Sequence, residues 1–182
     1  ADRAHSLVRQ RESRAAASER PSVGRRVEPG RSPMGIQISA LHVRRSGLIQ
    51  ATAERVWEEF TSFERFAAWF GRGHRLEVYE PRLGGRILLS VDIEGTKRSF
   101  GGPILIFEPA RELTFSNNWE SNGWPVPTLI TLRLTPLFDA CQIELFHHGF
   151  ERLGADASAA LQGYESGWHS RHLEALKAIV EG

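Results

Sequence analysis

Three side chains near the end of the sequence could act together on a ligand or a proton. Glu165, His169 and His172 are separated by four and three residues, so a helix would place them on one face. Carboxylate and imidazole groups in this arrangement can bind a metal ion or transfer protons. However, one helix rarely completes a metal site, and the spacing matches no established metal motif. Three interpretations stay open: a satisfied polar network or solvent-reaching histidines, groups that orient a ligand, and metal binding or acid–base catalysis.

The segment that carries these residues has the pattern of one long amphipathic helix, from Asp156 to Gly182. At 100° per residue, one face of this helix is apolar. It consists of Leu161, Trp168, Leu176 and Ile179. Glu165, His169 and His172 fall within the same arc, which predicts polar groups inside an otherwise apolar cavity. Such groups need partners, because a buried polar group without one costs about 1–3 kcal/mol.

Strand patterns precede this helix and predict which side chains face it. Residues 128–136 and 141–150 alternate between apolar and polar side chains, as half-buried strands do. In the second segment the alternation points His147 inward. In residues 112–119 the same period of two aligns Phe115 with Trp119, which places Trp119 near the end of the sheet, where a pocket could open.

The remaining sequence predicts an antiparallel α+β domain. Thr52 is a good N-cap for a short helix, and a second helix over 63–70 ends at Gly71, which suits a left-handed cap. Gly84-Gly85 and Glu94-Gly95 are typical of turns between strands. Further strands are expected at 38–49, 74–80, 86–93 and 98–107. These elements make seven strands, two short helices after the first strand, and one long helix at the end.

Composition limits the class of protein. The 182 residues suffice for one domain with a core, and 41% hydrophobic with 25% charged residues is typical of a globular protein. No apolar run reaches the roughly 18–20 residues of a membrane span. The single cysteine excludes an internal disulfide and fits a cytoplasmic location. Arginine outnumbers lysine 21 to 2, which we take as a sign of a bacterial source.

The first 34 residues differ from the rest. They contain eight arginines and four acidic residues and lack hydrophobic periodicity. We expect residues 1–34 to be a disordered leader or an upstream extension, and residues 35–182 to form the domain. The positive charge belongs to this leader, so it gives no indication of nucleic-acid binding by the domain.

Six short motifs stand in order along the domain: Ala51-Thr-Ala-Glu-Arg-Val-Trp57, Ala68-Trp-Phe-Gly71, Leu83-Gly-Gly-Arg86, Phe107-Glu-Pro109 with Leu113-Thr-Phe115, His147-His-Gly-Phe150, and Gly167-Trp168. Together, over about residues 38–182, they resemble the domain of the activator of heat-shock-protein-90 ATPase homologues, in the START/Bet v 1-like (SRPBCC) superfamily. The resemblance implies a helix-grip fold, with a curved antiparallel sheet of six to seven strands around a long C-terminal helix.

The resemblance also implies a cavity between the sheet and that helix, which would bind a small hydrophobic or aromatic molecule. His172 stands where the family pattern leads us to expect an aliphatic residue. The residues that we expect to line the cavity are Trp69, Phe115, Trp119, Ile130, His147, Glu165, Trp168 and His172.

Two alternatives belong to other functional classes. One is an enzyme that resembles polyketide cyclases, in which Glu165 and either His172 or His147 would move protons. The other is a co-chaperone-like module that binds proteins through its exterior. No catalytic motif such as a nucleophile elbow is present. We expect no catalytic residues, metal, cofactor, nucleic acid or membrane partner, and we leave a homodimer open.

Overall fold

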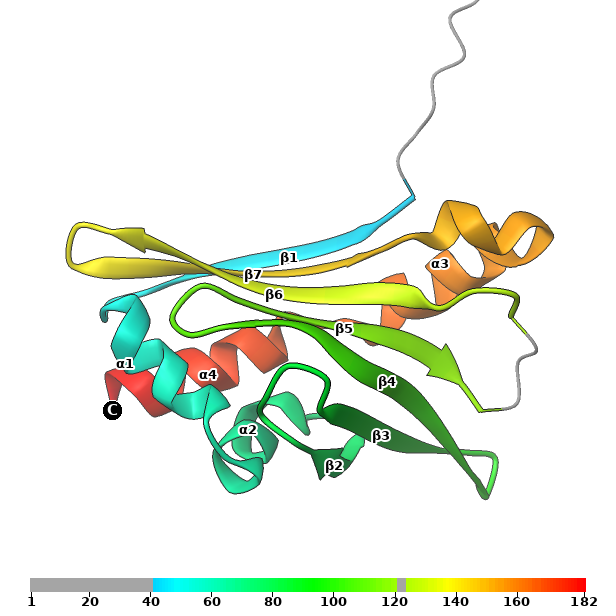
Figure 1. The fold of residues 1–182 in the computed structure, drawn as a ribbon, viewed down its shortest axis with the longest axis horizontal. Coiled ribbons are helices and arrows are strands. Elements are labelled where there is room, and N and C mark those ends of the chain that lie inside the picture. Colours follow the sequence, from blue (N-terminus) through cyan, green and yellow to red (C-terminus); the bar gives the residue numbers. More distant parts are fainter. Residues whose placement is uncertain (1–40, 121–123) are drawn as a thin grey trace, which may run out of the picture. The chain divides into compact units, whose positions relative to one another are not determined.

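Seven antiparallel strands form one sheet in the computed structural model, which describes residues 41–120 and 124–182 (Figure 1). The strands are β1 (Val43–Ile49), β2 (Arg75–Tyr79), β3 (Arg86–Ile93), β4 (Thr96–Glu108), β5 (Glu112–Trp119), β6 (Thr128–Leu137) and β7 (Ala140–His148). Their order is β1-β7-β6-β5-β4-β3-β2. This order and the antiparallel pairing confirm the predicted fold class. The predicted leader, 1–34, lies outside the described residues, and so does the start of the strand predicted at 38–49.

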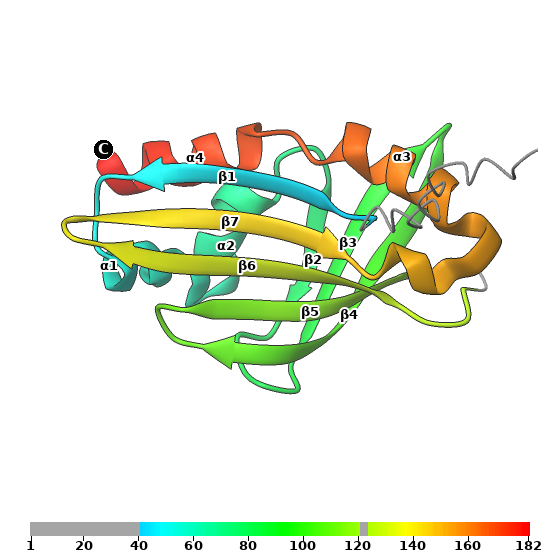
Figure 2. The same cartoon turned by 90° about the horizontal axis from the view of Figure 1, so that it is seen from above.

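The sheet curves strongly (Figure 2), and its two edge strands contact different helices: β1 packs against α4, and β2 packs against α2. Strand β4 bends at Gly101, where φ is +138° and a Cβ atom would lie 2.3 Å from the carbonyl oxygen of Ile87. Only glycine tolerates this conformation and this approach together. The register between β4 and β5 also shifts between Ile104 and Ile106, a bulge that adds to the local twist.

Two short helices follow β1 as predicted: α1 (Ala53–Trp57), with the 3₁₀ turn η1 (Glu58–Phe60), and α2 (Phe63–Phe70). Thr52 caps α1, because its hydroxyl oxygen accepts a hydrogen bond from the amide of Arg55 at 3.3 Å. The left-handed cap predicted at Gly71 is wrong. Gly71 has φ −74° and its amide continues the helical bonding to Ala67, and the chain turns at Gly73, where φ is +102°.

The C-terminal segment is helical but interrupted. After the 3₁₀ turn η2 (Phe150–Asp156), helix α3 (Ala157–Gly167) ends at Trp168, which has extended backbone angles, and α4 (Arg171–Glu181) follows (Figure 2). One continuous helix over 156–182 was expected. The break resets the helical phase, so a single projection at 100° per residue misplaces side chains on one side of it.

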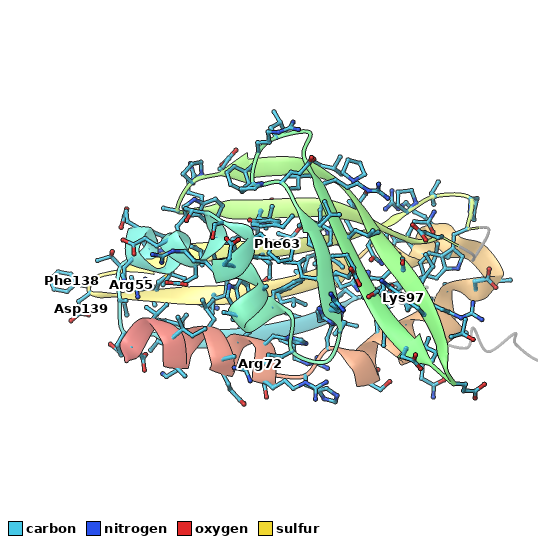
Figure 3. The ribbon with its side chains drawn as sticks, turned by 90° about the horizontal axis from the view of Figure 1, so that it is seen from below. Arg55, Phe63, Arg72, Lys97, Phe138 and Asp139 are labelled. Carbon is cyan, nitrogen blue, oxygen red and sulfur yellow. The ribbon has the colours of Figure 1, made fainter. Side chains whose placement is uncertain are left out.

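The core lies between the concave face of the sheet and the helices. Aromatic side chains of α2 fill its centre, and Phe66 stacks on Tyr79 with ring centroids 4.2 Å apart. Helix α4 packs against α2 and β1. The Nζ atom of Lys177 donates to the carbonyl of Leu48 at 2.9 Å, which fixes α4 beside the edge strand β1. At the far end of the β6–β7 hairpin, Phe138 is fully exposed (Figure 3).

Candidate functional site

A pocket with a volume of about 440 Å³ opens between α3 and the strands β3, β4 and β5. Its walls are mostly apolar. The lining residues of the sheet side are Val91, Ile93, Phe100, Trp119 and Trp124. Those of the helical side are Ala159, Ala160, Gly163, Tyr164, Gly167, Trp168, His169 and Arg171, and the turn before β2 contributes Gly73 and His74.

The pocket exists because α3 turns its small residues toward the sheet. Ala160, Gly163 and Gly167 follow each other at intervals of three and four residues, so they share one face of the helix. A Cβ atom built on Gly163 or Gly167 would meet no other atom within 4 Å. Apart from Tyr164, large aromatic residues are absent from this face of α3, and the space beside the small residues remains open.

A chain of hydrogen bonds crosses the core beside the pocket. The indole nitrogen of Trp168 donates to Nδ1 of His147 at 2.9 Å, and Nε2 of His147 lies 2.8 Å from the hydroxyl oxygen of Thr128. Thr128 in turn donates to the backbone carbonyl of Asn117. The side chain of Asn117 donates to the hydroxyl oxygen of Tyr164 at 2.8 Å. This network connects two pocket residues, Trp168 and Tyr164, through strands β5, β6 and β7.

The network fixes the state of His147. An indole nitrogen can only donate, so Nδ1 is the acceptor and Nε2 carries the proton. Burial lowers the pKa of His147 well below its ordinary value of 6.5, because the ring is fully buried and a charge there would be desolvated. Both ring nitrogens are therefore used within the core, which leaves His147 no free nitrogen for a ligand.

Two further histidines form a ring pair at the pocket: His74 lines the wall, and His172 is buried in the core. The ring centroids of His74 and His172 lie 5.2 Å apart. Burial is the main cause that lowers the pKa of each to about 4, and the positive charge of Arg171 acts in the same direction. Three ring nitrogens lack a hydrogen-bond partner among the described residues: both nitrogens of His172 and Nε2 of His74. The pair is therefore uncharged at neutral pH and has unused hydrogen-bonding capacity.

The structure separates the eight residues that were expected to line a cavity. Trp119 and Trp168 line the pocket, and Trp119 does so from the end of β5, where the strand period placed it. Five others are fully or almost fully buried in the core without contributing to the pocket wall: Trp69, Phe115, Ile130, His147 and His172. Glu165 is exposed on α3 and lies outside the pocket lining, whereas His169, just after the break at Trp168, is exposed and lines the pocket. The single helical projection misplaced Glu165 because the helical phase changes at Trp168.

The pocket residues that were not singled out from the sequence include Tyr164, His74, Trp124 and Arg171. Tyr164 lies one turn before Trp168 on α3, so helical spacing could have indicated it. His74, Trp124 and Arg171 lie in or next to turns, and no periodic pattern predicts where a turn residue points. The positions of His74, in the turn after α2, and of Arg171, at the start of α4, depend on how α4 packs against α2.

The residues that would move protons in the cyclase-like alternative do not come together in one site. Glu165 is exposed and lies outside the pocket lining, whereas His147 is enclosed by Trp168 and Thr128. Within residues 41–120 and 124–182, no group of three or more histidine, cysteine or acidic side chains is arranged to hold a metal ion. The pocket is chemically a hydrophobic chamber with a few polar groups on one wall.

Comparison with known families identifies the chain. The model of the family described as Activator of Hsp90 ATPase homolog 1-like protein matches residues 50–181. The chain belongs to this family. The match covers the two short helices, strands β2 to β7 and both C-terminal helices, and it includes every residue that lines the pocket.

Solved structures share the fold of this family member. Protein CV1439 from Chromobacterium violaceum is 25% identical, with a TM-score of 0.61 over 78% of this chain and 97% of that one. A protein from Arthrobacter aurescens is 21% identical, with a TM-score of 0.61 over 78% and 87% of the two chains. The Aha1 dimer from Colwellia psychrerythraea is 12% identical, with a TM-score of 0.52 over 77% and 96%. The curated proteins contain no match. Among the described residues, no helix has the length and apolar character that crossing a membrane requires.

Proposed function

We propose that this domain, residues 35–182, binds a small, largely apolar molecule in the pocket between α3 and the sheet. The observation that carries the proposal is the pocket of about 440 Å³, whose sheet side is mostly aromatic and whose helix side combines small residues with Tyr164 and Trp168. Small-molecule sites in proteins are concave, mostly apolar and typically about 300–1,000 Å³ in volume.

The aromatic side chains favour a flat or aromatic ligand. Phe100 and Trp119 pack together with ring centroids 4.6 Å apart, and Trp168 stands in the opposite wall. Offset aromatic contacts add about 0.5–1.5 kcal/mol to the burial of the surfaces themselves. The hydrogen bonds that fix Trp168 and Tyr164 keep this wall in place before a ligand arrives, which lowers the entropic cost of binding.

A neutral fluorescent probe tests the proposal. N-phenylnaphthylamine is apolar and small enough for the chamber, and its emission rises when it leaves water. We expect saturable binding with a dissociation constant in the micromolar range, together with quenching of tryptophan emission. Gly163→Phe should abolish binding, because the new side chain enters open space inside the pocket and fills it without a clash.

Gln162→Phe is the matched control. It adds the same ring to an exposed position of the same helix that does not line the pocket, so binding should persist. If the probe binds both variants equally, it binds elsewhere and the pocket proposal fails. If no probe in a varied aromatic and fatty-acid panel binds saturably, the co-chaperone-like alternative becomes the better account of the domain. The homodimer stays a prediction; the Colwellia relative is described as a dimer.

A further inference from the structure

One charged side chain lies in the wall of this apolar pocket without an ionic partner. Arg171 lines the pocket, and no acidic residue does. Arg171 forms no ion pair or side-chain hydrogen bond with any residue of 41–120 or 124–182. A second groove, which shares Gly73 and His74 with the pocket, contains two acidic side chains. Glu77 is paired with Lys97 at 2.7 Å, and Asp92 accepts a hydrogen bond from the amide of Gly95 at 2.8 Å. The pocket therefore presents a positive charge that no described residue neutralises.

The position of the guanidinium group is set by the turn opposite. A Cβ atom at Gly73 would lie 2.3 Å from Nη2 of Arg171, so the missing side chain leaves the space that the guanidinium occupies. The charge of Arg171 lowers the pKa of both His74 and His172, as expected for a cation close to both rings. Arg171 is also the first residue of α4, where the helix dipole disfavours a cation. Helix stability therefore does not explain why an arginine stands at position 171.

The geometry points to a carboxylic acid as the ligand: a small molecule with an apolar, aromatic body in the chamber and a carboxylate against Arg171. This inference rests on the proposed binding function. A guanidinium group binds a carboxylate with two parallel, charge-assisted hydrogen bonds. His74 lies in the same wall with Nε2 unpartnered. Its neutral ring adds hydrogen-bonding capacity but no charge, which leaves the attraction for the anion to Arg171.

The size of the effect follows from the exposure of Arg171, which is solvent-accessible at the pocket mouth. Exposed ion pairs contribute little, whereas bidentate pairs next to an apolar wall contribute more. We expect an acid to bind roughly tenfold more tightly than its neutral amide. This preference should shrink as salt is added, because an exposed pair is screened.

The test compares how well naphthoic acid and naphthamide displace N-phenylnaphthylamine. The two competitors share an apolar ring system and differ in charge, so the comparison measures the contribution of the carboxylate. The measurement is made at about pH 8, where ordinary histidines are neutral. On the wild-type protein the acid should displace the probe at roughly one tenth of the amide concentration. Arg171→Gln should remove this preference by weakening the acid alone. Arg72→Gln changes an exposed arginine in the turn after α2 that does not line the pocket (Figure 3), and it should leave the preference intact.

The outcomes distinguish the binding of a carboxylate at Arg171 from the binding of an apolar molecule in the pocket. If acid and amide compete equally on the wild type, or if the preference survives in Arg171→Gln, the carboxylate inference is wrong and the apolar binding function stands. If Arg72→Gln loses the preference as Arg171→Gln does, the effect comes from overall charge and the inference is again wrong. Failure of the neutral probe itself to bind overturns both.

Discussion

Trp168 donates its indole N–H to Nδ1 of His147 over 2.9 Å, and this bond ties the break between α3 and α4 to the inner face of strand β7. The residue that interrupts the helix is therefore also anchored to the sheet. Its ring stands in the pocket wall, so the shape of the pocket depends on a hydrogen bond made on the far side of that ring.

Trp168→Phe should destabilise the domain by roughly 1–3 kcal/mol, because it leaves Nδ1 of His147 buried without a donor. Urea unfolding followed by circular dichroism measures the free energy. Trp124→Phe is the control, since Trp124 lines the same pocket but forms no hydrogen bond with another described residue. A loss no larger than that of the control would show that the bond contributes nothing.

His172→Leu should leave the stability unchanged or raise it by up to about 1 kcal/mol. His172 is 1% exposed and neither ring nitrogen has a partner among the described residues, so the substitution removes an unsatisfied polar group. His147→Leu, by contrast, should cost several kcal/mol, because it breaks two buried hydrogen bonds. Thermal melts of both variants make the comparison, and equal losses would contradict it.

The stability should fall on mild acidification. The pKa values of His74 and His172 are about 4 in the folded protein, below the ordinary value of 6.5. Between these values the unfolded chain binds more protons, so the free energy of unfolding decreases as the pH drops from about 6.5 toward 4 and is unaffected by these two groups at higher pH. Urea titrations across this range would show the slope, and His172→Leu should reduce it. A flat profile would mean that both rings titrate normally.

Two glycine substitutions should have opposite effects. Gly101→Ala should cost at least about 2 kcal/mol, because φ is +138° and the new Cβ would meet the carbonyl oxygen of Ile87. Gly163→Ala should stabilise by roughly 0.5–1 kcal/mol, because its Cβ meets open space and alanine is the better helix former. Chemical denaturation of the two variants is the test, and a neutral Gly101→Ala would show that the bend of β4 does not require glycine.

The sheet could be predicted well because each strand carries its own evidence. Alternation at a period of two placed the face of Phe115 and Trp119 correctly, and the glycine turns fell where hairpins form. Local composition is sufficient for such elements, because side-chain direction in a strand follows directly from position.

The site could be predicted only in part, because it depends on one helix break. Ser166, Gly167 and Ser170 are weak helix formers around Trp168, but no proline marks the interruption. Because the helical phase changes at Trp168, Glu165 was assigned to the interior although it is exposed and does not line the pocket. The relation of Arg171 to Gly73 arises from tertiary packing alone, and no sequence pattern contains it.

The close attachment of α4 to β1 has a consequence for self-association. The open edge of a sheet can add a strand from another molecule, and proteins guard such edges with charge or with a covering helix. Strand β1 carries two charged side chains, Arg44 and Arg45, and Arg45 donates to the backbone carbonyls of Glu165 and Trp168. The ammonium group of Lys177 on α4 donates to the carbonyl of Leu48 on the same strand. This edge is thereby closed to strand addition, so copies of the domain that associate would meet through side-chain surfaces and not by extending the sheet at β1.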